Sequence, residues 1–229
     1  MVEPTPRIAL IHALEESVYP ARNAFAHMWP EAFCFDLLDT SLAIDLADLG
    51  HLDQPMMQRF QTLADYATAT TGKAGQTQAI LFTCSAFGPA IDAVKEKLPI
   101  PVLRPNEAAF EDALAIGSNI GLLVTFGPSS AALEEELHAM AKQRGKDIRV
   151  TTIVADSALA ALKAGDGDRH DQLAVEASRA LEHLDVLVLG QFSLARAADP
   201  IRGVISAPVL TTPGSAVAAL KARLAPPSF

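Results

Sequence analysis

Short apolar runs alternate with longer amphipathic segments from one end of the chain to the other. The runs are nearly continuous and rich in Val, Ile and Leu, which is typical of parallel strands covered on both faces. Strands that alternate with helices predict a doubly wound α/β fold with right-handed crossovers. The predicted strands are Ile8–Ile11, Ala32–Leu38, Ala79–Phe82, Pro101–Leu103, Ile120–Val124, Ile148–Val154, Val186–Leu189 and Pro208–Leu210.

Three of the amphipathic segments carry helix signals. Ser129–Arg144 has leucines and a methionine at helical spacing, and Gly145 follows as a helix stop. Asp168–Leu184 has the same kind of spacing. Pro213–Leu224 begins with a proline, which suits the first turn of a helix. We therefore predict helices over these three ranges.

An internal repeat relates the two halves of the chain. The stretch that begins AILFTCSAFGPA resembles the one that begins VLVLGQFSLARA, and each returns through Pro-Val-Leu before another helix. Cys84 precedes Pro101 by 17 positions, and Gln191 precedes Pro208 by 17 positions. The starts of the two halves, RIALIHALEES and NIGLLVTFGPSS, also match. These matches occur in the same order, which indicates a duplication.

The repeat predicts a first lobe of residues 1–117 with 211–229, including the C-terminal helix, and a second lobe of residues 118–210. In open parallel sheets, ligands lie beyond the carboxyl ends of the strands. If a pseudo-twofold axis relates the lobes, the polar turns at these strand ends face one another across a cleft. The turns are His12–Ser17, Thr83–Phe87, Thr125–Ser130 and Gly190–Ser193.

Cys84 is the candidate catalytic residue, because it lies between a buried strand and a helix start. The helix dipole and free N–H groups are expected to lower the pKa of a thiol there. The thiolate can exchange a proton with carbon or attack an electrophilic carbon. A small buried strand-end residue is the alternative, but flanking Thr83 and Ser85 favour a functional turn. Cys34, between two phenylalanines, is expected to be an inert core residue.

Polar residues near other helix starts are candidates for binding an anion. Thr125, Ser129 and Ser130 offer hydroxyl groups beside free N–H groups, which suits a carboxylate. Ordinary N-capping by Ser129 is the alternative. Asn106 follows the predicted strand Pro101–Leu103 and can reach the cleft, but the N-cap of the following helix is the favoured role.

His12 is a candidate acid or base that Glu15 can orient. A solvated turn with Ser17 as its cap is the alternative. Gln191 cannot exchange a proton near neutral pH, but it can donate and accept hydrogen bonds, with Ser193 as a second donor. The expected cleft therefore has an ionisable thiol on one side and polar groups that do not ionise on the other.

Composition narrows the classes of partner. The net charge of −9 argues against nucleic acid, because phosphate binding needs clustered Lys and Arg. No apolar run approaches the roughly 20 residues that span a bilayer, so we expect no membrane association. Met1–Arg7 lacks the pattern of a signal peptide, and a cytoplasmic location with reduced cysteines is expected. The six histidines lack the spacing of a zinc helix, so we expect no metal.

The chain resembles the aspartate/glutamate/hydantoin racemase superfamily, which includes maleate isomerase and arylmalonate decarboxylase. The resemblance covers most of the chain. It rests on Ile80–Ser85 (ILFTCS), on Gly121–Thr125 (GLLVT) with its serine-rich helix start, and on Val188–Gly190 (VLG). It implies two pseudo-symmetric flavodoxin-like halves with parallel sheets, an active site between them, and catalysis without metal, pyridoxal phosphate or another cofactor. A homodimer is expected from the resemblance alone.

Racemases of this superfamily carry one cysteine in each half, one removing the α-proton and the other protonating the opposite face. Cys84 matches the first cysteine, whereas Gln191 stands where the second is usual. The resemblance therefore does not imply a symmetrical reaction with two thiols. Arylmalonate decarboxylase also works with one cysteine, but it keeps the second and lacks the first.

The sequence thus predicts a cofactor-independent isomerase or racemase-like enzyme that acts on a small carboxylate or amino-acid-like substrate through Cys84. A one-sided decarboxylase, lyase or hydrolase is one alternative, and a non-catalytic protein that binds a small acid is another. The predicted substrate-binding residues are His12, Ser17, Ser85, Ala86, Thr125, Ser129, Ser130, Gln191 and Ser193.

Overall fold

A computed structural model describes residues 5–181 and 183–225. The contacts divide the chain into two compact units, which we call unit 1 (Met1–Pro105 with Ala216–Phe229) and unit 2 (Asn106–Ser215). The first four residues of the Met1–Arg7 segment and the last four of the predicted first lobe lie outside the described residues, as does residue 182 of a predicted helix.

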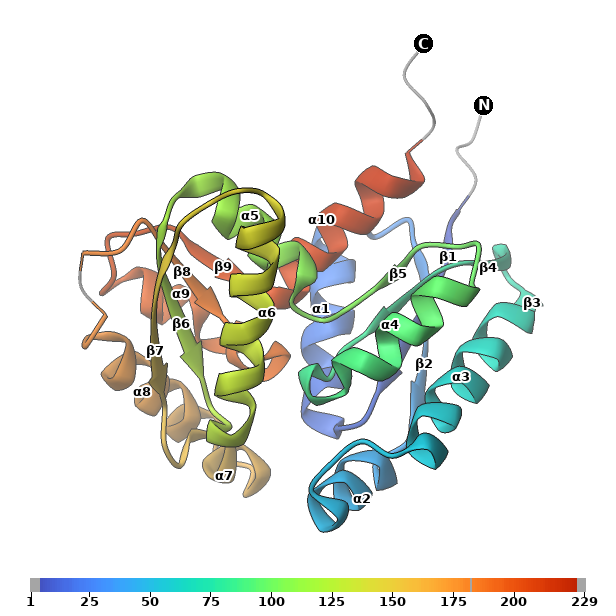
Figure 1. Cartoon of the computed structure of the whole chain (residues 1–229), viewed down its shortest axis with the longest axis horizontal. Helices are drawn as coiled ribbons and strands as arrows, with labels where there is room; N and C mark the ends of the chain where they lie inside the picture. The colour runs from blue at the N-terminus through green and yellow to red at the C-terminus, as the bar shows by residue number, and fades with distance from the viewer. Residues whose placement is uncertain (1–4, 182, 226–229) are drawn as a thin grey trace. The chain divides into compact units, whose positions relative to one another are not determined.

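Unit 1 alternates strands and helices (Figure 1). Its elements are β1 (Arg7–His12), the short 3-10 turn η1 (Glu15–Ser17), α1 (Val18–Met28), β2 (Phe33–Leu38), α2 (Ser41–Leu49), α3 (Gln54–Ala69), β3 (Thr71–Gly72), β4 (Gly75–Phe82), η2 (Ser85–Phe87), α4 (Gly88–Lys97) and β5 (Val102–Leu103). The last helix, α10 (Thr212–Leu224), begins in unit 2 and continues into unit 1.

The sheet of unit 1 is parallel in the order β2-β1-β4-β5. The two-residue strand β3, which the sequence analysis did not predict, pairs antiparallel with the start of β4. Alternate strand residues such as Ala9, Ile80 and Phe82 pack with α2, α3 and α4 into one core cluster. The intervening strand residues, such as Leu10 and Leu81, are also fully buried, so both faces of the sheet are covered and the strands are continuously apolar.

Unit 2 begins with a helix and then repeats the same pattern. Its elements are α5 (Glu107–Ile116), β6 (Asn119–Val124), η3 (Gly127–Ser129), α6 (Ser130–Gln143), β7 (Arg149–Val154), α7 (Ala158–Lys163), α8 (Gly167–Ser178), β8 (Val186–Leu189), η4 (Phe192–Ala197), α9 (Ala198–Arg202) and β9 (Val209–Thr211). The sheet is parallel in the order β7-β6-β8-β9. One core cluster joins it to α5 and α6, and another joins it to α7, α8 and α9.

Strand registers support the duplicated halves. In unit 1, Leu10 of β1 is paired with Leu81 of β4. In unit 2, the equivalent Leu122 of β6 is paired with Val188 of β8. The pairing of β4 with β5 likewise matches that of β8 with β9, so the 17-residue spacing seen in the sequence corresponds to the same strand–helix–strand step.

Three boundaries differ from the expected ones, and the first is that unit 1 resumes at Ala216 and not at 211. The boundary after unit 1 falls at residue 105 and not at 117, because α5 packs through Phe110 and Ala113 into a core of unit 2. The helix predicted over Asp168–Leu184 ends at Ser178. His183 has a φ of 56°, in the left-handed region, which is incompatible with a continuing helix.

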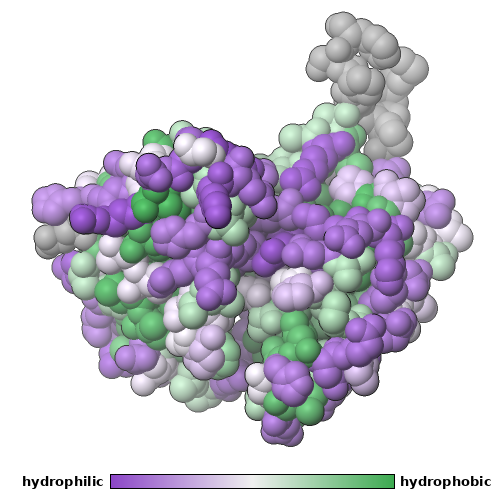
Figure 2. All heavy atoms as spheres, viewed as in Figure 1, coloured by the Kyte–Doolittle hydropathy of each residue, from purple (hydrophilic) through white to green (hydrophobic). Residues whose placement is uncertain are grey.

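Hydrophilic residues predominate on the face drawn in Figure 2, and hydrophobic ones form separate patches there. Such scattered apolar side chains are normal for a protein surface. Within residues 5–181 and 183–225, no helix combines the length and apolarity that crossing a bilayer requires.

Candidate functional site

Cys84 lies two residues after Phe82, the last residue of β4, and directly precedes η2. Its backbone is still extended, with φ −117° and ψ 121°, and the chain turns into the helical segment after it. The neighbouring strand β1 ends beside it, because the Thr83 N–H donates to the carbonyl oxygen of Ile11 over 3.0 Å. Parallel pairing therefore brings the ends of β1 and β4 together at one edge of the sheet of unit 1.

The Cys84 residue is partly exposed, but its side chain packs against the core cluster of unit 1. Burial raises the pKa of the Cys84 thiol to about 11, and the backbone N–H of Ala86 opposes this by donating to the sulfur. The expectation of a lowered pKa was therefore wrong. The N–H groups at the helix start act in the predicted direction, but desolvation of the thiolate outweighs them.

A narrow pocket adjoins the thiol, with too little space for a water molecule. It is lined by Ile11, His12, Ala13, Leu42, Phe60, Phe82 and Cys84. His12 and Cys84 thus share one small space within unit 1, although 72 positions separate them in the chain.

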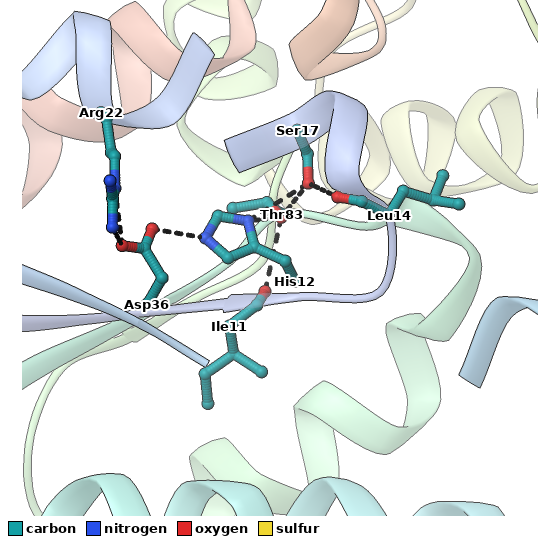
Figure 3. Close-up of polar contacts among 7 residues, drawn as sticks. All are labelled: Ile11, His12, Leu14, Ser17, Arg22, Asp36 and Thr83. Atoms are coloured by element: carbon teal, nitrogen blue, oxygen red, sulfur yellow. Dashed lines mark hydrogen bonds and ion pairs between the residues drawn. The ribbon is translucent and has the colours of Figure 1, made fainter. Parts of the chain in front are cut away.

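The His12 ring is completely buried and has polar partners on both sides (Figure 3). Its Nδ1 lies 2.8 Å from Thr83 Oγ1 and 3.2 Å from Ser17 Oγ. The two hydroxyl oxygens lie 2.9 Å apart, and Ser17 donates to the carbonyl oxygen of Leu14 over 2.7 Å. These contacts place the predicted His12 and Ser17 in one hydrogen-bonded group, behind the turn that carries Cys84.

Asp36 on β2 holds the other side of the ring (Figure 3). His12 Nε2 lies 3.0 Å from Asp36 Oδ1, and Arg22 Nε donates to Asp36 Oδ2 over 2.6 Å. Burial raises the pKa of the Asp36 carboxyl, but the hydrogen bonds and charges of His12 and Arg22 outweigh burial and lower it. The expected partner, Glu15, is therefore replaced by Asp36.

Sequence reasoning missed Asp36 and Arg22. The available signal was a charged residue inside the otherwise apolar run Phe33–Leu38. A carboxylate on a strand covered by helices needs a charged or hydrogen-bonding partner, because burying an unpaired charge is costly.

The equivalent turn of unit 2 is held by Gln191. Its Oε1 accepts from the backbone N–H of Thr125 over 2.8 Å, and its Nε2 donates to Ser129 Oγ over 3.1 Å. Ser129 and Ser130 donate their own hydroxyl protons to the carbonyl oxygens of Phe126 and Gly127. Ser129 does not make the N-capping bond that was the alternative role, because its hydroxyl group donates to Phe126. The hydroxyl groups of Ser129 and Ser130, which were expected to bind an anion, donate to acceptors within unit 2.

The remaining candidates lie apart from these two clusters. Ser85 and Ala86 form η2 directly after Cys84, and Ser193 is buried in η4. Asn106 occupies the N-cap position of α5 without the expected capping bond, and neither amide atom has a hydrogen-bond partner among the described residues. Burial raises the pKa of the Cys34 thiol to about 12, which fits the expected inert residue.

Within the described part of the chain, no group of three or more His, Cys, Asp or Glu side chains is arranged to hold a metal ion.

Solved structures of racemases share this fold. A glutamate racemase from Francisella tularensis subsp. tularensis SCHU S4, in complex with D-glutamate, has a TM-score of 0.69 at 14% identity, over 97% of this chain and 82% of that one. The aspartate racemase of Picrophilus torridus has a TM-score of 0.69 at 14% identity, over 95% and 94%. An allantoin racemase from Pseudomonas fluorescens has a TM-score of 0.68 at 17% identity, over 94% and 89%.

These likenesses establish an α/β fold with two parallel sheets, as predicted. The family model for Asp/Glu/Hydantoin racemase matches residues 30–220, and the chain belongs to this family. Membership supports an enzyme of the racemase or isomerase type. Among curated proteins, none matches the sequence.

Proposed function

We propose that this protein is a cofactor-independent isomerase or racemase-like enzyme that acts on a small carboxylate or amino-acid-like compound through Cys84. The proposal rests on the position of Cys84. This partly exposed thiol lies at a strand end, accepts a contact from the Ala86 N–H and lines the same pocket as His12. Ligands of parallel sheets bind at such strand ends.

The raised pKa gives Cys84 a defined starting state. Near neutral pH the resting side chain is a thiol, which can donate its proton to a carbanion or enolate. The thiolate left behind takes up a proton from carbon when the reaction runs in the other direction. For proton exchange the thiol first gives its proton to solvent, and the thiolate then takes a proton from carbon and returns one to carbon. After a decarboxylation, solvent reprotonates the thiolate, so neither reaction needs a redox cofactor.

The substrate class is proposed from the family and from the turn itself. The similar structures are named as racemases of glutamate, aspartate and allantoin, which are small polar compounds. In unit 1 we propose Ser85 and Ala86 as direct contacts, because they follow the thiol and are partly exposed. His12 and Ser17 are buried, and we propose that they support the turn from behind.

Gln191 favours a one-sided reaction as a second candidate. An amide cannot carry a proton between two faces of a substrate near neutral pH, and this one already binds Thr125 and Ser129. Decarboxylation followed by protonation from Cys84 needs only one thiol. The predicted pairing of Cys84 with Gln191 across a substrate stays a prediction.

The test is a screen of small α-substituted acids, amino acids and hydantoins in deuterium oxide. We expect wild-type protein and the control Cys34→Ala to incorporate solvent deuterium into one of these compounds. Cys84→Ala is expected to lose at least about 100-fold in rate, because general acid–base groups contribute on that scale. Full turnover by Cys84→Ala would overturn the proposal.

Product analysis separates the candidate functions. Deuterated product in both configurations indicates racemisation, whereas release of carbon dioxide with deuterium in the product indicates decarboxylation. A compound that binds tightly and is recovered unchanged and undeuterated indicates a non-catalytic binding protein.

A further inference from the structure

The residue before the candidate thiol, Thr83, is fixed through both its backbone and its side chain (Figure 3). Its N–H donates to the carbonyl oxygen of Ile11 over 3.0 Å. Its buried Oγ1 lies 2.8 Å from His12 Nδ1, 2.9 Å from Ser17 Oγ and 3.4 Å from the carbonyl oxygen of Ile11. One hydroxyl group therefore connects the end of β4 to the end of β1 and to η1, whichever of these partners receives its proton.

Unit 2 makes the equivalent connection from a different position. In the repeat, Ser17 corresponds to Ser129, and each serine hydroxyl donates to the carbonyl oxygen three residues earlier. Ser129 binds the side chain of Gln191, which occupies the position equivalent to Cys84. Ser17 binds the side chain of Thr83, which lies one position before the thiol. Both units thus use the same serine, but the side chain that binds it comes from different positions.

Packing around Gly190, the equivalent of Thr83, disfavours the unit 1 arrangement in unit 2. The N–H groups of both residues make the same bond to the neighbouring strand. A β-carbon on Gly190 would lie 3.0 Å from Val124 Cγ1, so a side chain at this position is crowded. In unit 1 the position of Val124 is occupied by His12, whose ring contacts the Thr83 hydroxyl group. The histidine therefore provides a polar partner for a side chain placed before the thiol.

We propose that Thr83 is a positioning residue for Cys84, because its hydroxyl group holds the turn to Ser17 and His12. In unit 2, Gln191 forms the equivalent bonds itself. The Cys84 sulfur is not used in this way and stays available for a substrate, a consequence that rests on the proposed function. Without the hydroxyl group the turn should open more often, which exposes the thiol but moves it from the position needed for proton transfer.

The first test measures alkylation of Cys84 by iodoacetamide at pH 7.5 without substrate, read by mass spectrometry. Thr83→Val keeps the shape of the side chain but removes the hydroxyl group, and should react about fivefold faster than wild type, the scale of one hydrogen bond. Thr83→Ser keeps the hydroxyl group and should react at nearly the wild-type rate. An unchanged rate in Thr83→Val, or an equally raised rate in Thr83→Ser, overturns the proposal.

Two further variants separate positioning from general stability. Thr77→Val removes another buried hydroxyl group from β4, which contacts Thr70 Oγ1 at 3.0 Å. It should cost similar stability in urea but leave the alkylation rate unchanged. Ser17→Ala removes the partner of Thr83, should speed alkylation in the same way, and carries the test if Thr83→Val does not fold. Faster alkylation in Thr77→Val, or an unchanged rate in Ser17→Ala, would show that the proposal is wrong.

The second test is turnover of the substrate found in the deuterium screen. Thr83→Val should lower kcat at least about tenfold with little change in KM, because misplaced reacting groups lose rate on that scale. Thr83→Ser should restore kcat. Faster alkylation together with slower turnover is a result that a loss of stability alone does not give, and an unchanged kcat overturns the positioning role. Alkylation needs no substrate, so the role of Thr83 and the catalytic role of Cys84 can fail separately.

Discussion

The Cys84 turn of unit 1 and the Gln191 turn of unit 2 occupy the same position in the same strand frame, yet their chemistry differs. Cys84 is an ionisable group with one N–H contact at its sulfur. Gln191 is a neutral amide whose oxygen and nitrogen both bind within unit 2. The turn of unit 1 thus carries a titratable group, whereas in the turn of unit 2 the Gln191 side chain forms hydrogen bonds that stabilise the neighbouring loop.

Neighbouring positions show the same division. The registers place Asp36 beside Leu10 in unit 1 and Thr152 beside Leu122 in unit 2. In the repeat, the position equivalent to His12 is occupied by Val124 in unit 2. The shared arrangement of strands therefore does not by itself create acid–base chemistry. In unit 1 several ionisable residues occur close together, and the pKa of Asp36 is lowered by its hydrogen bonds and charge contacts with His12 and Arg22.

The largest expected effect is on catalysis, and it tests the comparison directly. Cys84→Ala should lower solvent deuterium exchange into the substrate by about 10²–10⁴-fold, the scale of a lost acid–base group. Gln191→Ala should lower it by less than about tenfold, because an amide carries no proton in the reaction. Rates are measured side by side at saturating substrate. An equal loss in both variants would break the comparison.

The next effect concerns stability at low pH. The pKa of Asp36 is lowered in the folded protein. The ionised carboxylate therefore stabilises the folded state above the pKa of about 3.9 that Asp has in the unfolded chain, and this stabilisation is lost as the pH falls through the pKa of the folded state. Asp36→Asn should lower the free energy of unfolding by about 1.5–3 kcal/mol at pH 7. Urea unfolding between pH 7 and 3 measures this, and the difference from wild type should shrink towards acid pH.

For unit 2, Gln191→Ala should lower the free energy of unfolding by about 1–2 kcal/mol, because the buried Thr125 N–H loses its acceptor. Gln191→Glu keeps an acceptor oxygen but loses the amide donor to Ser129, so its loss should be smaller. Urea unfolding at pH 7 compares the two variants. A larger loss in Gln191→Glu than in Gln191→Ala would contradict this expectation, because the alanine variant lacks both bonds.

The smallest effect has the opposite sign. Thr152 Oγ1 is buried and finds no hydrogen-bond partner in the part of the chain that the structure describes. Thr152→Val removes this hydroxyl without changing the side-chain shape, and valine suits a strand. The free energy of unfolding should rise by up to about 1 kcal/mol. Destabilisation in urea would mean that the hydroxyl is satisfied in solution.

Most of the fold could be predicted because its signals are local. Every predicted strand overlaps an observed one, since a buried parallel strand needs an apolar run of its own. The two-residue β3 has too few residues to leave such a pattern. The boundary between the units depends on the core into which Phe110 of α5 packs, and the spacing of residues in the sequence does not indicate this packing.

The candidate site was predictable only where it follows a strand end. Cys84 and Gln191 were found from the repeat, and both lie two residues after the end of their strands. The partner of His12 was missed because it depends on the lateral register of β1 with β2, which brings Asp36 to the ring. The direction of the Cys84 pKa shift was missed because burial depends on the whole surrounding core.

The path of α10 has a consequence for how the protein is made. Ala216, Val217 and Leu220 of this helix are fully buried and belong to unit 1, and Lys221 donates to the carbonyl oxygen of Met28. Since a ribosome releases the chain from its N-terminus onward, unit 1 begins first but receives its closing helix after all of unit 2 has emerged. Nascent chains stopped at residue 105 should therefore remain sensitive to protease.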